Sequence, residues 1–209
     1  MKSPYIYDIF YIVSHSQPYK RSDYMPSTAL LFESKLVTFC SPTLLKMKAG
    51  NIFNISNEFN ELEECLNYYN QLCNQRGIYI SIIHENNNSK MIYVYQKEKL
   101  NNLFNNHKFR AVLNNYHYPY QDIDSLINWL KIRMNSSEFP HEIGLFLGYP
   151  LTDVKGFING ADYKYIGYWK VYSHVPQTLC TFDRYKKCTQ ELKRRFCQGE
   201  RIEQLLAHV

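Results

Sequence analysis

Residues 57–77 of the chain read NEFNELEECLNYYNQLCNQRG, and residues 78–96, which follow directly, read IYISIIHENNNSKMIYVYQ. In the first stretch, apolar side chains recur every three or four positions, which is the spacing of one helix face. These side chains are Phe59, Leu62, Leu66, Tyr69 and Leu72. Ser56 or Asn57 suits the N-cap position and Gly77 suits the end, so we predict a helix over residues 57–75.

The second stretch predicts two strands joined by a turn. Residues 78–84 and 91–96 are rich in Ile, Val and Tyr, the residue types that strands favour. Residues 85–89, between them, contain consecutive asparagines and are typical of a turn. A helix followed by an antiparallel hairpin indicates an α+β fold, in which a small, mostly antiparallel sheet packs against several helices.

Helical patterns recur along the rest of the chain. Apolar periodicity and helix-ending residues predict helices over residues 97–105, 108–116, 122–134, 140–147, 152–158 and 177–197, a strand over residues 165–172 and a short C-terminal cap over residues 200–208. The helices over residues 140–147 and 152–158 are close enough in sequence to form a short helical hairpin.

Upstream of residues 57–96, apolar residues fit a helix over residues 27–39. We expect this helix to end at Cys40, because a proline two residues further on disfavours helical angles at the residue before it. Residues 40–50 are expected to form a loop with a helical turn, which leads into a short apolar stretch over residues 51–55.

The domain organisation follows from these elements. Residues 1–26 contain three prolines and one predicted strand, over residues 5–13, and are interpreted as an N-terminal arm. Residues 27–209 are expected to form a single α+β domain, because a chain of this length buries a sizeable core.

Composition restricts the classes of partner. With 45% hydrophobic and 21% charged residues, the chain is neither disordered nor fibrous. The net charge of +5 favours anionic partners without requiring them, and nucleic-acid-binding proteins are usually more basic. Nineteen Tyr and twelve Phe occur beside many Asn, Lys and Ile, a composition that an AT-rich genome also produces, so aromatic content alone does not indicate a stacking site.

Six cysteines occur without a Cys-x-x-Cys pair, and neither a secretion signal nor a long apolar run is present. We therefore expect reduced thiols and a cytoplasmic protein. Cys65 and Cys73 lie beside the apolar stripe of the first helix and are expected in the core. Cys40 lies at a helix end and Cys188 adjoins two lysines, which would favour a thiolate. Each of these two is either a reactive thiol or ligand, or a buried structural cysteine.

Residues 138–151 carry the densest combination of polar and apolar groups. Pro140 suits the first helical position, which would leave His141 and Glu142 in the first turn, where free N–H groups and the helix dipole favour an anion. This geometry could serve a binding site. Alternatively, Glu142 merely complements the dipole and His141 lies at the surface.

The same region also has the spacing of a helix-turn-helix over residues 142–148 and 152–158. Many helical hairpins share this spacing. The second helix offers Thr152, Lys155 and Asn159 as contacts, whereas Asp153 would repel a phosphate backbone. Nucleic-acid binding is therefore an alternative and not the leading hypothesis.

Residues 167–172 alternate along the strand predicted over residues 165–172. Alternation places Tyr168, Lys170 and Tyr172 on one face. If this face lines a cleft, it suits a planar anionic ligand through stacking and cation–π contact. A ladder of surface side chains is equally consistent with the pattern.

Several motifs, taken together and in order, carry a family resemblance. They are CSPTL with Lys48 and NIF over residues 40–53, FPHEIGLFLGYPL over residues 139–151, DVKGFI over residues 153–158, GYWKVY over residues 167–172 and FDRYKKCT over residues 182–189. From about Ser27 onwards the chain resembles the domain of unknown function 3793 family, bacterial proteins found mostly in anaerobes. Members often carry a cysteine near the position of Tyr165, which this chain lacks. The resemblance implies a bacterial cytoplasmic setting and no particular activity.

The leading hypothesis is that the protein binds a small molecule or a cofactor of unknown identity. A redox role for this ligand is part of the hypothesis. Its cleft is expected to draw on Cys40, Lys48, His141, Glu142, Tyr168, Lys170 and Cys188. No metal is expected, since the sequence lacks metal-ligand spacing and the common nucleotide and hydrolase motifs. A helix-turn-helix module and a cysteine-dependent enzyme are the alternatives.

Overall fold

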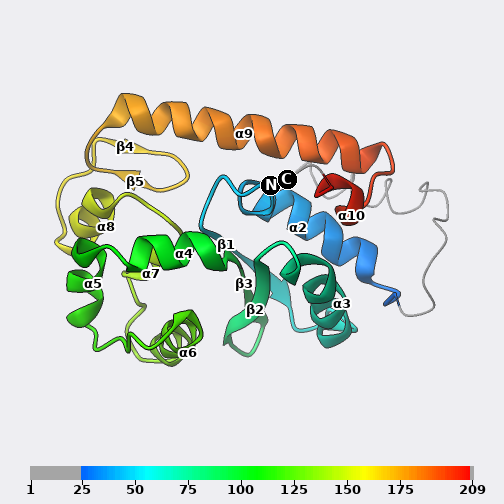
Figure 1. Ribbon diagram of the computed structural model, residues 1–209, viewed down its shortest axis with the longest axis horizontal. Coiled ribbons are helices and arrows are strands. Elements are labelled where there is room, and N and C mark those ends of the chain that lie inside the picture. The colour runs from blue at the N-terminus through cyan, green and yellow to red at the C-terminus, as the bar shows by residue number, and fades with distance from the viewer. Residues whose placement is uncertain (1–24, 208–209) are drawn as a thin grey trace.

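The computed structural model describes residues 25–207, which form nine helices and five strands. The helices are α2 (Ala29–Leu44), α3 (Leu62–Asn74), α4 (Lys97–Phe104), α5 (His107–Asn114), α6 (Ile123–Met134), α7 (Ile143–Phe146), α8 (Leu151–Ile158), α9 (Val175–Cys197) and α10 (Ile202–Leu205), and the strands are β1 (Gly50–Ser56), β2 (Ile78–Glu85), β3 (Ser89–Gln96), β4 (Tyr165–Ile166) and β5 (Lys170–Val171) (Figure 1). The predicted strand over residues 5–13 lies outside the described residues.

The main sheet has three antiparallel strands in the order β1-β3-β2. The predicted hairpin is confirmed as β2 and β3, and its turn is held by Asn86, whose side-chain oxygen accepts the N–H groups of Asn88 and Ser89 at 2.9 Å each. The apolar stretch over residues 51–55 becomes β1, which pairs with β3 along its length. The α+β fold class is confirmed.

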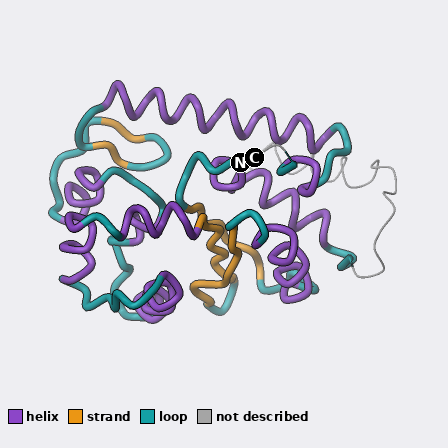
Figure 2. Tube along the Cα trace, viewed as in Figure 1, coloured by secondary structure: helices purple, strands orange, loops and turns teal. Residues whose placement is uncertain are grey.

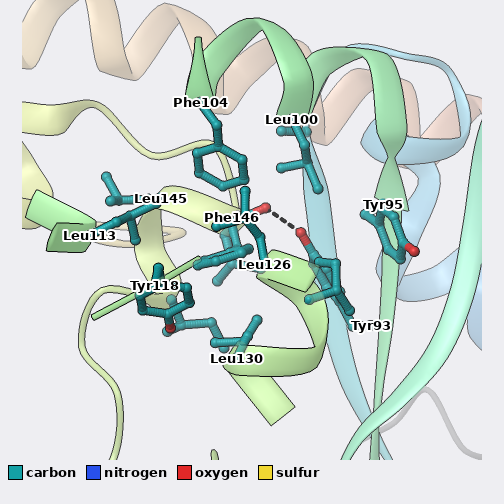
Figure 3. Packing of buried hydrophobic residues seen from close by; sticks show 14 of the residues in the cluster. Tyr93, Tyr95, Leu100, Phe104, Leu113, Tyr118, Leu126, Leu130, Leu145 and Phe146 are labelled. Carbon is teal, nitrogen blue, oxygen red and sulfur yellow. Dashed lines mark hydrogen bonds between the residues drawn. The ribbon is translucent and has the colours of Figure 1, made fainter. Parts of the chain in front are cut away.

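Helices cover both faces of this sheet, which lies at the centre of the molecule (Figure 2). Successive side chains of a strand point to opposite faces, so β3 contributes to two cores. Ile92 and Val94 pack with α2, α3 and α10, whereas Tyr93 and Tyr95 pack with α4 to α7. The second core is shown in Figure 3, where the Tyr93 hydroxyl donates a hydrogen bond of 2.6 Å to the carbonyl oxygen of Phe146 in α7.

The long helix α9 runs beside α2 along one edge of the molecule (Figure 1). Near its C-terminal end, Leu192 and Phe196 pack with Val37 of α2 and Leu205 of α10. Near its N-terminal end, Phe182 contacts the ring of Trp169 in the β4–β5 hairpin. This one helix therefore packs against α2 and α10 at its C-terminal end and against the β4–β5 hairpin at its N-terminal end.

The prediction that the first helix ends at Cys40 is wrong, because α2 continues to Leu44 with Pro42 inside it. Pro42 lies in the last turn, and its carbonyl accepts the N–H groups of Met47 and Lys48 at 2.8 and 3.0 Å. Leu44 is fully buried in the core beneath the sheet, so burial of this last turn outweighs the local preference against a proline.

The predicted start of the second helix is also wrong. The helix α3 begins at Leu62, after Glu61 takes a left-handed conformation with φ of 58°. The Glu61 carboxylate accepts hydrogen bonds from the Ser27 hydroxyl at 2.6 Å and the Thr28 N–H at 3.1 Å. This contact with the start of α2 is distant in sequence, so the local pattern could not reveal it. The helix ends at Asn74, one residue before the predicted end at residue 75, and Gly77 follows it with φ of 72°, as expected of a terminating glycine.

Two further predictions are corrected near the C-terminal half. The helix over residues 140–147 shrinks to the single turn α7, so His141 and Glu142 precede it rather than occupy its first turn. The strand over residues 165–172 becomes two short strands around a turn, because the Gly167 N–H bonds to the Trp169 carbonyl at 3.1 Å. The turn requires Gly167, since a Cβ there would clash with the ring of Phe182.

Candidate functional site

A cavity of about 290 Å³ opens between α7, α8 and the β4–β5 hairpin. Its lining is Phe139, His141, Ile143, Gly144, Tyr149, Asp153, Val154, Phe157, Tyr168, Trp169 and Lys170. Most of this lining is hydrocarbon, and the polar groups are few. Small-molecule sites combine these two properties. We call this cavity the aromatic pocket.

Asp153 fixes the hairpin that forms one wall of the aromatic pocket. Its carboxylate, which is buried in α8, accepts hydrogen bonds from the Trp169 indole N–H at 2.8 Å and the Tyr172 N–H at 2.9 Å. The Ser173 N–H donates to the same carboxylate at 3.3 Å. The three donors engage both carboxylate oxygens, so Asp153 has a structural role here and offers little to a ligand.

The Trp169 ring forms part of that wall. It stacks on Tyr149, with ring centroids 4.6 Å apart and an interplanar angle of 25°. The edge of the Phe182 ring meets it from α9, with centroids 4.5 Å apart and an angle of 85°. Such pairs, together with the Asp153 hydrogen bond, hold the indole in one orientation.

Lys170 brings a positive charge to the aromatic pocket. Its Nζ lies 5.3 Å from the ring centroid of Phe157 and 5.1 Å from that of Tyr163. Among residues 25–207, no carboxylate forms an ion pair with it. The rings stabilise the ammonium through cation–π contact, which leaves its N–H donors for a ligand.

His141 lines the aromatic pocket and is exposed to solvent. Its ring meets Phe157 edge-on, with centroids 4.9 Å apart and an angle of 76°. Within the described part of the chain, neither ring nitrogen is hydrogen-bonded. The imidazole therefore adds a second polar group with free hydrogen-bonding capacity.

Glu142 points away from the aromatic pocket, although it is the next residue after His141. It is fully buried and accepts a hydrogen bond from Arg133 Nε at 2.8 Å and from the Tyr118 hydroxyl at 3.1 Å. Burial and the nearby carboxylate raise the pKa of Tyr118 well above its usual value. Glu142 thus forms a structural ion pair beneath α7, outside the lining of the pocket.

Cys40 and Lys48 also lie outside the lining. Burial raises the pKa of the Cys40 thiol far above its ordinary value, and nearby Lys48 offsets this only in part. Lys48 is 5% exposed, and burial lowers its pKa to about 8. Its Nζ lies 5.0 Å from the centroid of Tyr149, so Lys48 contacts the wall of the aromatic pocket without lining it.

Cys188 is buried in α9, and burial raises the pKa of its thiol to about 11. The sequence predicted the opposite, because it placed Cys188 beside two lysines. One of these, Lys187, is exposed and paired with Asp183 at 2.7 Å. Its charge is therefore neutralised in solvent, and desolvation of the thiol dominates.

Of the seven side chains expected in one cleft, the structure brings three together, namely His141, Tyr168 and Lys170. Tyr168 is 50% exposed at the turn of the hairpin and packs against Phe182. Tyr172, which was expected on the same strand face, packs against Gly156 of α8 instead, because the turn ends the alternation.

Sequence reasoning missed Tyr149, Asp153, Phe157 and Trp169. The turn at Gly167 breaks the predicted alternation, and Trp169 lines the pocket together with its neighbours Tyr168 and Lys170. Asp153 carried a usable signal, since a carboxylate that lies between apolar residues in the first turn of a helix requires hydrogen-bond donors when it is buried. The identity of those donors depended on the return of the hairpin to α8, which is not a local property.

Two negative findings apply to residues 25–207. No group of three or more His, Cys, Asp or Glu side chains there is arranged to hold a metal ion. Among the helices of this part of the chain, none combines the length and the apolar character needed to span a bilayer.

A family model described as "Protein of unknown function (DUF3793)" matches residues 36–206. The chain belongs to this family. The match starts somewhat later than the resemblance seen in the sequence and includes every residue that lines the aromatic pocket. No curated protein and no solved structure matches the chain.

Proposed function

We propose that the protein binds a small organic molecule in the aromatic pocket. The observation that carries this proposal is an open cavity of about 290 Å³ whose hydrocarbon walls enclose a lysine without an anionic partner among the described residues. Ligand sites typically pair an apolar lining with a few polar groups that orient the ligand.

The walls of the aromatic pocket are held in place before any ligand binds. Asp153 fixes the hairpin through Trp169 and Tyr172, and the hydrogen bond from Tyr93 to Phe146 fixes α7 to the sheet. A preformed site loses little conformational entropy on binding, which supports a binding role.

The cysteine-based alternatives receive less support from the geometry. Cys40 and Cys188 are buried, and burial raises the pKa of both thiols. A thiol that stays protonated at neutral pH is a weak nucleophile and a weak redox group. Neither thiol lines the aromatic pocket, so a redox role for a bound ligand would need another electron carrier.

The helix-turn-helix alternative requires the face of α8 to be free. Asp153 of α8 is buried under the hairpin, and the Thr152 hydroxyl is within hydrogen-bond distance of the Ser173 hydroxyl, at 2.9 Å. Two of the positions that would approach DNA are thus engaged within the protein, which favours the small-molecule proposal over this one.

Fragment screening by two-dimensional NMR tests the proposal. The chain has two tryptophans, Trp169 in the aromatic pocket and Trp129 in α6, so the indole N–H region holds one reporter and one internal control. We expect fragments to shift the Trp169 signal and leave the Trp129 signal unchanged. A library of flat aromatic fragments that moves neither signal at millimolar concentration would contradict the proposal.

Phe157→Ala sharpens this test, because the ring is 40% exposed and forms part of the lining. Removing it should weaken fragment binding about tenfold while lowering the free energy of unfolding by less than about 1 kcal/mol. Phe39→Ala is the matched control, since that ring is 48% exposed on α2 and lies outside the lining. Equal loss of binding in both variants would argue against the aromatic pocket as the site.

A further inference from the structure

We infer that the ligand of the aromatic pocket is a planar aromatic carboxylate, an inference that rests on the binding function proposed above. It follows from an inventory of the polar groups that face the cavity and from the arrangement of the rings around them. Some of these polar groups are already hydrogen-bonded within the protein, whereas others are free to bind a ligand. The hydrogen-bonded group is a carboxylate, and the free groups include a positively charged lysine.

The engaged group is anionic. Asp153 is the carboxylate in the lining, and its oxygens accept the Trp169 indole N–H and the backbone N–H groups of Tyr172 and Ser173. A cationic ligand would compete with these donors for the carboxylate oxygens, and their loss would release the hairpin and leave the partly buried Trp169 indole N–H without its acceptor. The geometry therefore disfavours a ligand that carries a positive charge.

The free groups are hydrogen-bond donors. The Lys170 ammonium contacts rings and, within residues 25–207, no carboxylate. The His141 imidazole meets the Phe157 ring and no hydrogen-bonding side chain of the described residues. Both lie in the lining of one cavity, so an anionic group on the ligand would meet the positive charge of Lys170 there.

The rings determine the shape of the ligand. Phe157 and Tyr168 are large apolar side chains in the lining that remain 40% and 50% exposed. A flat aromatic ligand would cover this exposed surface and stack against it, whereas a flexible aliphatic acid would gain less. A bicyclic ring with one carboxylate combines the flat shape and the charge that the lining selects.

The test compares three compounds with the same ring system, namely 2-naphthoate, 2-naphthamide and 2-naphthylmethylammonium. Binding is measured from the shift of the Trp169 indole N–H signal, which a spectrum of Trp129→Phe assigns. We expect naphthoate to bind about tenfold more tightly than the neutral amide, as expected for a partly shielded charged hydrogen bond. The ammonium compound should bind more weakly than either.

Lys170→Met keeps the length of the side chain and removes its charge, and we expect it to abolish the preference for naphthoate over naphthamide. Lys170→Arg should restore this preference. Lys155→Met is the matched control, since Lys155 is exposed on the same helix as Asp153 and lies outside the lining. An unchanged Trp129 signal in every variant shows that the fold is intact.

The outcomes separate the inference from the proposed function. If the carboxylate and the amide bind equally to the unaltered protein, or if the ammonium compound binds most tightly, the inference is overturned while the binding function stands. If Lys170→Met retains the preference for the carboxylate, the assignment of the charge to Lys170 is overturned. If no compound moves the Trp169 signal, both the inference and the binding function fall.

Discussion

The two ends of α9 border regions with opposite properties. At the C-terminal end, buried polar groups have partners: the Glu33 carboxylate accepts the Ile202 N–H at 2.5 Å and the Tyr69 hydroxyl at 3.1 Å. At the N-terminal end, large rings are exposed and the Lys170 ammonium lacks an anionic partner among the described residues. We call these regions the closed end and the open end. A ligand bound at the open end would cover the exposed rings and give the Lys170 ammonium a partner.

This comparison predicts that substitutions at the closed end chiefly affect stability, and the largest effect is expected for Phe32→Ala. Phe32 is fully buried, and its ring packs against Tyr69 and Phe53. Its removal should lower the free energy of unfolding by about 4 kcal/mol, through lost transfer energy and the cavity left behind. Urea denaturation measures this loss. A loss below about 1 kcal/mol would show that the closed end is loosely packed.

The pH dependence of stability is the next largest effect. Burial, opposed by nearby Arg201, raises the pKa of Glu33 from 4.5 to about 7 in the folded protein. Between these two values the folded state binds more protons than the unfolded state, so the stability contributed by Glu33 is present below pH 4.5 and is lost as the pH rises through 7. The expected loss is about 3 kcal/mol.

Glu33→Gln should flatten this part of the profile, because an amide does not titrate. Chemical denaturation at several pH values checks the difference between the two proteins. The control is Glu63→Gln, at an exposed position in the first turn of α3. Parallel profiles for the unaltered protein and Glu33→Gln would mean that Glu33 has the same pKa in the folded and unfolded states.

Asp153→Ala tests the link between the hairpin and α8, with an expected loss of about 2 kcal/mol. The substitution leaves the Trp169 indole N–H and the Tyr172 N–H without their acceptor. The hairpin should then loosen, which hydrogen exchange of the Tyr172 amide would detect as faster exchange. Thr152→Ala, which removes a hydroxyl contact between exposed side chains, should have a much smaller effect. Similar exchange rates in both variants would contradict the role assigned to Asp153.

The elements predicted correctly are those with local causes. The hairpin of β2 and β3, and the helices α4, α5, α6 and α9, follow from periodicity and turn residues within a single stretch. The errors have nonlocal causes. The helix α2 passes Pro42 because its last turn is buried against the sheet, and α3 starts late because Glu61 bonds to Ser27.

Of the residues predicted for the candidate site, some line the aromatic pocket and others do not. His141 was singled out by its predicted place in the first turn of a helix, and Tyr168 and Lys170 by their alternation along a predicted strand. All three line the aromatic pocket, although both elements are shorter than predicted. Cys40 and Cys188 were singled out by their neighbours in sequence, but the pKa of a thiol depends on burial in three dimensions. Tyr149 and Trp169 could not be paired in advance, because their contact joins a loop to a hairpin that follows a full helix.

The docking of the hairpin has a consequence for mutational tolerance. At Gly167 the backbone abuts the ring of Phe182, and at Gly156 it abuts the ring of Tyr172, with no space for a Cβ at either position. Neither glycine is fully buried. A saturation library selected for folded protein should therefore lose nearly every variant at these two near-surface positions, while neighbouring Lys155 accepts most amino acids.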